Sequence, residues 1–297
     1  MRFFRSARWL LPALLLSLIP ASSHAQFSIS ISVGFAPPAL PVYVQPMCPE
    51  PNLMWMPGYW AYSNDDGDYY WVPGAWVPAP YEGALWTPPY WGWSGGNYGF
   101  HEGYWGDHVG FYGGVNYGFG FGGIGFAGGE WRGGSFAYNT AVTQVNVNIV
   151  HVTYVNETIV SAGIVANPNH VAFNGGPGGI QHTATPAEQA VEKEKHIAPT
   201  SVQTQHAATA KTDKTSFAKA NGGRPKTLAV EKPLTGEKQA APAVTKAEPK
   251  TEPMAAPKAE PKAEPKAEPM AAPKAEPKAA PKAAAPKTEP KPEAKPK

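Results

Sequence analysis

Hydrophobic and polar residues along this chain follow the patterns of short β-strands separated by turns. Apolar residues alternate with serine from Phe27 to Val33, which is the period of a half-buried strand. Six prolines between residues 37 and 51 then favour an extended, non-helical backbone. Runs of β-branched residues farther along predict three more strands, at 141–154, 158–165 and 171–173.

A tryptophan motif recurs at a nearly constant distance in the middle of the chain. W-M-P-G-Y-W at 55–60 returns as W-V-P-G-A-W at 71–76 and as W-T-P-P-Y-W at 86–91, with looser copies at 100–105 and 131–136. The first aromatic residues of the first four copies are 16, 15 and 14 residues apart. Such a period is typical of a repeated supersecondary unit.

The proline–glycine pair of the motif predicts a type II turn, in which glycine supplies a positive φ. If the chain reverses there, Trp71 and Trp76 face each other as a cross-strand pair, which contributes roughly 0.2–1 kcal/mol. Because a type II turn fits strand twist poorly in a two-residue hairpin, a wider loop or a corner is the alternative. The acidic run 63–68 predicts a second kind of turn, between strands at 59–62 and 69–72.

Residues 95–134 hold 17 glycines in 40 positions, interleaved with aromatic residues. A strand with one bare glycine face admits close approach of another backbone, so we expect this region to pack within the domain. Self-association, membrane contact or flexible disorder are the alternatives. The whole pattern predicts an all-β fold, a meander of short strands built from aromatic and Gly-Pro repeats, followed by a long disordered Pro/Ala/Lys/Glu tail.

Composition divides the chain into successive segments. All ten tryptophans lie at or before Trp131, and the only aromatic residue after position 174 is Phe217. Since a packed core needs large apolar side chains, we expect one folded unit, at roughly 40–175. The predicted segments are a signal peptide (1–25), an extended Pro-rich segment (26–50), the repeat and Gly/aromatic region (51–136), a β-rich segment packing with the repeats (137–179), a polar linker (180–240) and an AEPK/AAPK tail (241–297).

The first 25 residues have the organisation of a secretory signal peptide. Three arginines precede an apolar stretch at 9–19, and small residues follow, so cleavage is expected between Ala25 and Gln26. Farther along, no run of 18 apolar residues predicts a transmembrane helix in the mature chain. The chain is thus expected to be exported to the periplasm, the outer membrane or the medium.

Charge is segregated along the chain. Residues 26–185 hold nine acids and one base, a net −8, whereas residues from 186 onward hold 21 Lys/Arg and 14 Asp/Glu, a net +7. The acidic part argues against a nucleic-acid ligand, because phosphate binding needs clustered Lys and Arg. The basic part favours anionic surfaces.

No group of residues predicts catalysis, a metal ion or a cofactor. His101, Glu102, Asp107 and His108 could in principle bind Zn²⁺, but they are better explained as exposed loop residues. The acids at 65–68 lack the spacing of a Ca²⁺ loop and are explained by a turn. Cys48 is the only cysteine, so no internal disulfide is possible. We expect a buried thiol, with an intermolecular disulfide as the alternative.

The motif copies at 55–60, 71–76 and 86–93, with 100–105 as a weaker copy, resemble the W-x-x-G-x-W (also Y-x-W-G-x-W) repeat proteins of bacterial envelopes, which are related to the small protein BcpO. The third copy departs from this pattern, since Pro89 replaces the motif glycine. The resemblance implies export and β-rich repeats, and it implies no established reaction.

Two functions of different classes fit these features. The first is an exported, non-catalytic structural or interaction protein of the cell envelope, whose repeat domain packs or self-associates and whose tail is a spacer or binds anionic surfaces. The second is a carbohydrate-binding module, with envelope glycan as partner. An outer-membrane-associated β structure is a third possibility. Exposure of the rings discriminates the first two, and the residues concerned are Trp55, Trp60, Trp71, Trp76, Trp86, Trp91, Trp93, Trp105 and Trp131.

Overall fold

The computed structural model describes residues 31–235 of the 297-residue chain. The predicted signal peptide, the Ala25–Gln26 junction, most of the predicted first strand and the AEPK/AAPK tail lie outside this range. None of the described helices is long and apolar enough to cross a membrane.

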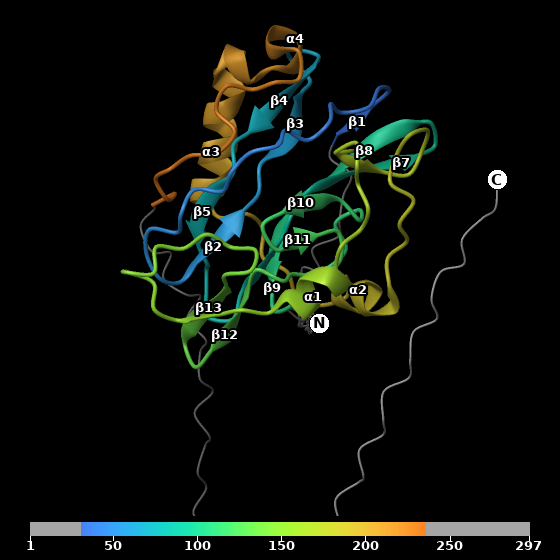
Figure 1. Ribbon diagram of the computed structural model, residues 1–297. Helices are drawn as coiled ribbons and strands as arrows, with labels where there is room; N and C mark the ends of the chain where they lie inside the picture. The colour runs from blue at the N-terminus through green and yellow to red at the C-terminus, as the bar shows by residue number, and fades with distance from the viewer. Residues whose placement is uncertain (1–30, 236–297) are drawn as a thin grey trace, which may run out of the picture. The chain divides into compact units, whose positions relative to one another are not determined.

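Short strands in six small sheets dominate the described residues, which confirms the all-β fold class (Figure 1). The strands are β1 (Ser32–Val33), β2 (Leu53–Met56), β3 (Tyr59–Ser63), β4 (Asp68–Val72), β5 (Ala75–Pro78), β6 (Leu85–Thr87), β7 (Tyr90–Ser94), β8 (Asn97–His101), β9 (Tyr104–Gly106), β10 (Asn116–Gly118), β11 (Phe121–Gly122), β12 (Gly129–Arg132), β13 (Ser135–Asn139), β14 (Thr153–Tyr154) and β15 (Phe173–Asn174). The helices are α1 (Glu157–Ala162), α2 (Pro186–Val191), α3 (Ser201–Thr212), the 3₁₀ turn η1 (Lys214–Ser216) and α4 (Ala218–Asn221).

Two long hairpins form the centre of the molecule. In the first, β2 and β3 run antiparallel to β5 and β4, and one register holds from Leu53 opposite Pro78 to Ser63 opposite Asp68. In the second, β6 and β7 pair with β9 and β8 in the same way, from Leu85 opposite Gly106 to Ser94 opposite Asn97. The acidic run closes the first hairpin, as predicted.

Neither the Pro-Gly pairs of the first two motif copies nor the Pro-Pro pair of the third reverses the chain, so the predicted turn at these copies is wrong. Because proline has no N–H, the ladder is interrupted between β2 and β3, and the strand direction and register continue on the other side. Trp71 therefore faces Trp60, and Trp76 faces Trp55. A reversal does occur in the fifth copy at Trp131–Phe136, which lacks proline and turns through Gly133 and Gly134 with φ of 51° and 82°.

The spacing of the motif distributes its rings over two cores. The two tryptophans of one copy are five positions apart, and an odd spacing places them on opposite faces of an extended chain. One core accordingly contains Trp55, Trp76, Trp86 and Trp105. The other contains Trp60, Trp71, Trp91 and Phe100. Each long hairpin thus contributes one aromatic pair to each core.

The segment 137–179 has less β-structure than predicted. Of the segment 141–154, which was predicted as one strand, only β14 is a strand in the structure. The segment 158–165, also predicted as a strand, begins as helix α1. The side chain of Asn156 caps this helix by accepting a hydrogen bond from the Ile159 N–H (3.2 Å). Local capping therefore overrides the β propensity of the branched residues.

The predicted polar linker at 180–240 is wrong for residues 180–235, which fold back onto the hairpins. Helices α3 and α4 lie along β4 (Figure 1). Phe217 is 4% exposed and its ring lies 5.6 Å from that of Tyr70. Capping boxes start α2 and α3, and main-chain groups of residues 180–235 form hydrogen bonds with the hairpins. This part of the chain therefore packs with few large apolar side chains.

The packing of residues 180–235 can be tested at Phe217. Truncation by Phe217→Ala should lower the free energy of unfolding by about 3–5 kcal/mol, because it leaves a cavity in a buried aromatic contact. Denaturant unfolding followed by circular dichroism measures this loss. Phe35→Ala is the matched control, since Phe35 is 49% exposed, and it should cost clearly less. Equal, small losses in both variants would show that residues 180–235 do not pack.

Candidate functional site

Most of the repeat tryptophans are core residues. Seven of them are at most 2% exposed: Trp55, Trp60, Trp71, Trp76, Trp86, Trp91 and Trp105. Of the nine predicted ring positions, only Trp93 and Trp131 are partly exposed. The carbohydrate-binding alternative therefore loses the seven buried rings, because a sugar cannot reach a ring that is enclosed on all sides.

The buried rings pair across the hairpins in edge-to-face or tilted contacts. The centroids of Trp55 and Trp76 are 5.2 Å apart at 63°, and those of Trp60 and Trp71 are 5.3 Å apart at 68°. The second hairpin repeats this with Trp86 and Trp105 at 5.3 Å and with Trp91 and Phe100 at 5.0 Å. Such pairs contribute about 0.5–1.5 kcal/mol beyond their buried area.

In the two long hairpins, each motif glycine lies under a tryptophan of the opposite strand. A Cβ at Gly74 would come within 2.6 Å of Trp55 Cζ2. The ring of Trp71 covers Gly58 in the same way, and Trp86 covers Gly103. The glycine is thus required for close approach of a ring.

Four indole N–H groups donate to acceptors in the segments before and after the repeats. Trp60 Nε1 donates to Ala39 O (3.1 Å) and Trp76 Nε1 to Pro46 O (2.9 Å), which fixes the Pro-rich segment before the repeats. The C-terminal part is held by Trp71 Nε1 donating to Leu228 O (3.1 Å) and by Trp105 Nε1 donating to Gln203 Oε1 (2.7 Å). A buried indole N–H is costly without an acceptor, and for these four rings the flanking segments supply one.

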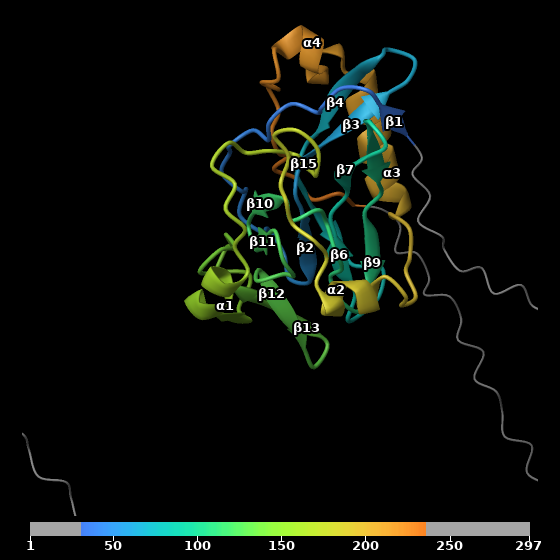
Figure 2. The same cartoon turned by 90° about the vertical axis from the view of Figure 1, so that its right-hand side faces the viewer.

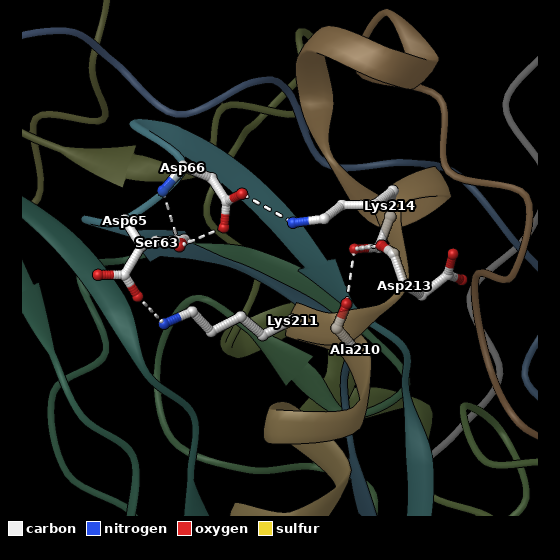
Figure 3. Close-up of polar contacts among 8 residues, drawn as sticks. Ser63, Asp65, Asp66, Ala210, Lys211, Asp213 and Lys214 are labelled. Carbon is white, nitrogen blue, oxygen red and sulfur yellow. Dashed lines mark hydrogen bonds and ion pairs between the residues drawn. The ribbon is translucent and has the colours of Figure 1, made fainter.

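The acidic turn of the first hairpin is bound by lysines of the C-terminal part (Figure 3). Lys211 Nζ lies 2.9 Å from Asp65 Oδ2, and Lys214 Nζ lies 2.7 Å from Asp66 Oδ1. The hydrogen bond from Lys214 and one from Ser63 lower the pKa of Asp66. Two of the acids that might have suggested Ca²⁺, Asp65 and Asp66, therefore have cationic partners, and these pairs are exposed and individually weak. The third, Asp68, accepts hydrogen bonds from the main-chain N–H groups of Tyr69 and Lys219.

The histidine and carboxylate groups near 101–108 do not converge. His101 stacks on Tyr90 with centroids 4.3 Å apart, and burial lowers its pKa. His108 Nδ1 lies 2.9 Å from Glu194 Oε2, while Asp107 accepts a hydrogen bond from the Tyr81 hydroxyl (2.8 Å). Among residues 31–235, no group of three His, Cys, Asp or Glu is placed to hold a metal ion.

A groove of about 520 Å³ is lined by residues of α2 and of the β12–β13 hairpin. Both elements are labelled in Figure 2. Aromatic side chains of Trp131, Tyr154 and Phe126 line it, together with acidic groups that include Glu130 and Glu188. Trp131 is a predicted site residue, whereas Tyr154 and Glu188 were missed. The T-x-x-E sequence at 185–188, a capping-box signal, could have located α2 and with it Glu188.

Comparison with known proteins identifies the repeat. A family model described as the WXXGXW repeat matches two copies at residues 54–77. This chain carries WXXGXW repeats. No curated protein and no solved structure matches the chain.

The two matched WXXGXW copies are the two arms of the first long hairpin, so the structural unit is a pair of repeats. The second long hairpin departs from the WXXGXW pattern at two linked places. Pro89 stands where the first hairpin has Gly58, and Phe100 stands where it has Trp71, the ring that covers that glycine. The second long hairpin thus lacks both the glycine and the tryptophan ring that would cover it.

The requirement for the WXXGXW glycine can be tested by adding one methyl group. Gly74→Ala should lower the free energy of unfolding by about 1–3 kcal/mol, because the Cβ forces the Trp55 ring out of its position. Equilibrium unfolding followed by tryptophan emission measures the change. Gly34→Ala is the control, since the nearest atom to its Cβ would be Asn97 Oδ1 at 3.8 Å. If Gly74→Ala is no less stable than Gly34→Ala, the ring-on-glycine contact is not required.

Cys48 should be unreactive in the folded protein. Its thiol is buried, donates to Glu50 O (3.1 Å), and has its pKa raised to about 11, chiefly by burial. Only a very small fraction is thiolate at neutral pH, so labelling with a disulfide reagent should be slow until the protein is denatured. Labelling of the native protein at the rate of the denatured chain would contradict this.

Proposed function

We propose that this chain is an exported, non-catalytic structural or interaction protein of the cell envelope. The observation that carries the proposal is the use of the repeat tryptophans as core and as anchors for both flanking segments. The repeat tryptophans are buried and bind the flanking segments, so they form a rigid scaffold and not a binding surface. Export is supported by the signal-peptide organisation of residues 1–25.

The charged C-terminal segment supplies the second part of the proposal. Residues 241–297 contain 14 prolines, 12 lysines and 8 glutamates. Prolines at such density favour extended chain, and the excess of lysine favours contact with anionic wall or lipid groups. The folded scaffold would then hold this segment at the envelope as a spacer or as an ionic adhesive.

Burial of seven of the nine rings removes most of the support for the carbohydrate-binding alternative. Of the predicted platform rings, Trp93 and Trp131 keep partial exposure, and they belong to different hairpins and to different cores. The ring of Trp93 is itself engaged by Tyr98, at 4.6 Å between centroids. Two separated rings do not form a continuous stacking surface for an extended glycan.

Cell fractionation tests this proposed function. The exported protein should begin at Gln26, sediment with the envelope at low salt and be released at high salt, because its contacts are ionic. Changing the 12 lysines of 241–297 to glutamine should leave export intact and abolish sedimentation. Retention of an uncleaved chain in the cytoplasm would refute export. Salt-resistant binding by the glutamine variant would refute the ionic role of the segment.

A further inference from the structure

The groove beside Trp131 has acidic groups left over after internal pairing. Glu188 is 4% exposed and lines the groove. Its Oε2 accepts hydrogen bonds from the Thr185 N–H (2.8 Å) and hydroxyl (2.9 Å), whereas its Oε1 has no hydrogen-bond partner within residues 31–235. A buried carboxylate oxygen without a donor is costly, and a donor entering the groove would remove that cost.

The charges around the groove favour a cationic donor. Asp107, Glu130 and Glu188 all line it. Within residues 31–235, Asp107 forms no ion pair with lysine or arginine. The imidazole of His108, which also lines the groove, already contacts Glu194. Glu130 is paired with Arg132 at the rim. The lining is therefore acidic overall.

The rim of the groove already shows how a cation is held there. The guanidinium carbon of Arg132 lies 4.6 Å from the centre of the Tyr154 ring, while its Nη2 is paired with Glu130. An aromatic face combined with a carboxylate is a general arrangement for binding organic cations. Elsewhere in the lining, Trp131 and Phe126 offer aromatic surface and Glu188 offers a carboxylate.

We propose that this groove binds a primary ammonium group carried on an apolar stem, the chemistry of a lysine side chain or a short diamine. The stem would lie along Trp131 and Phe126, and the ammonium would donate to Glu188 Oε1. A volume of about 520 Å³ is within the range of small-ligand sites. This assigns the chain a ligand class that its proposed structural role does not require.

The test uses the full-length mature chain and probes that differ only in their head groups. Pentane-1,5-diamine is titrated and followed by the NMR signal of the Trp131 indole N–H, which is assigned by its loss in Trp131→Phe. The diamine should shift this signal in a salt-sensitive manner, whereas pentane-1,5-diol, which has the same stem, should not. A short N-acetylated lysine peptide is titrated in parallel. Tighter binding of the peptide assigns the ammonium to a protein partner, and tighter binding of the diamine assigns it to a free amine.

Glu188→Gln separates recognition from folding, because glutamine at this position preserves the capping box of α2. It should weaken diamine binding about tenfold, the loss expected for one charge-assisted hydrogen bond. Glu102→Gln is the matched control, since it removes an exposed acid that does not line the groove, and its affinity should equal that of the wild type. The proposal is overturned if both variants weaken binding equally, if the diol binds as well as the diamine, or if a neutral chito-oligosaccharide shifts the Trp131 signal and the diamine does not.

Discussion

The contact between a tryptophan ring and a bare glycine on the opposite strand determines the geometry of both long hairpins. At this point proline has removed a ladder hydrogen bond, and the ring of Trp55 or Trp71 fills the space over Gly74 or Gly58. Burying one such ring contributes on the order of 4–6 kcal/mol by area, more than one backbone hydrogen bond. The interruption can therefore be tolerated without loss of register, and each hairpin passes through it as a single unit.

Four of the buried rings donate their indole N–H groups to acceptors in the segments that flank the repeats. Two of these acceptors, Ala39 O and Leu228 O, belong to segments without regular structure, and a third is the side chain of Gln203 in α3. An aromatic core thereby organises residues far beyond the repeats, from the Pro-rich segment to the end of the described chain. This explains why α3 and α4, which bury few side chains of their own, still lie in fixed positions on β4.

The repeat, the all-β class and the acidic turn could be predicted from the sequence, because each depends on local residue pattern. The pairing of Trp55 with Trp76 could not be derived from turn propensity, since Pro-Gly is compatible both with a reversal and with an interrupted strand. The five-residue spacing, an odd number, was the available indication of two opposite faces. The packing of 180–235 was missed because composition counts apolar side chains, whereas this segment is held by capping boxes, indole acceptors and the single ring of Phe217. Tyr154 and Glu188 were missed for the same reason, as long-range folding alone places them beside Trp131.

The repeat copies divide into those that build the fold and one that is available for another purpose. In the copies containing proline the chain continues straight and the first tryptophan is enclosed. In the copy at 131–136, two glycines replace the proline–glycine pair, the chain reverses, and Trp131 ends on a surface hairpin instead of inside a long one. Its indole still donates to Ala84 O (3.0 Å), so the ring is held rigidly while part of its surface lines the groove. Loss of proline alone does not cause this, because the copy at 100–105 also lacks proline and continues straight from β8 to β9. The reversal through Gly133 and Gly134 is what places Trp131 as a fixed aromatic wall beside Glu188, whose Oε1 has no hydrogen-bond partner among the described residues.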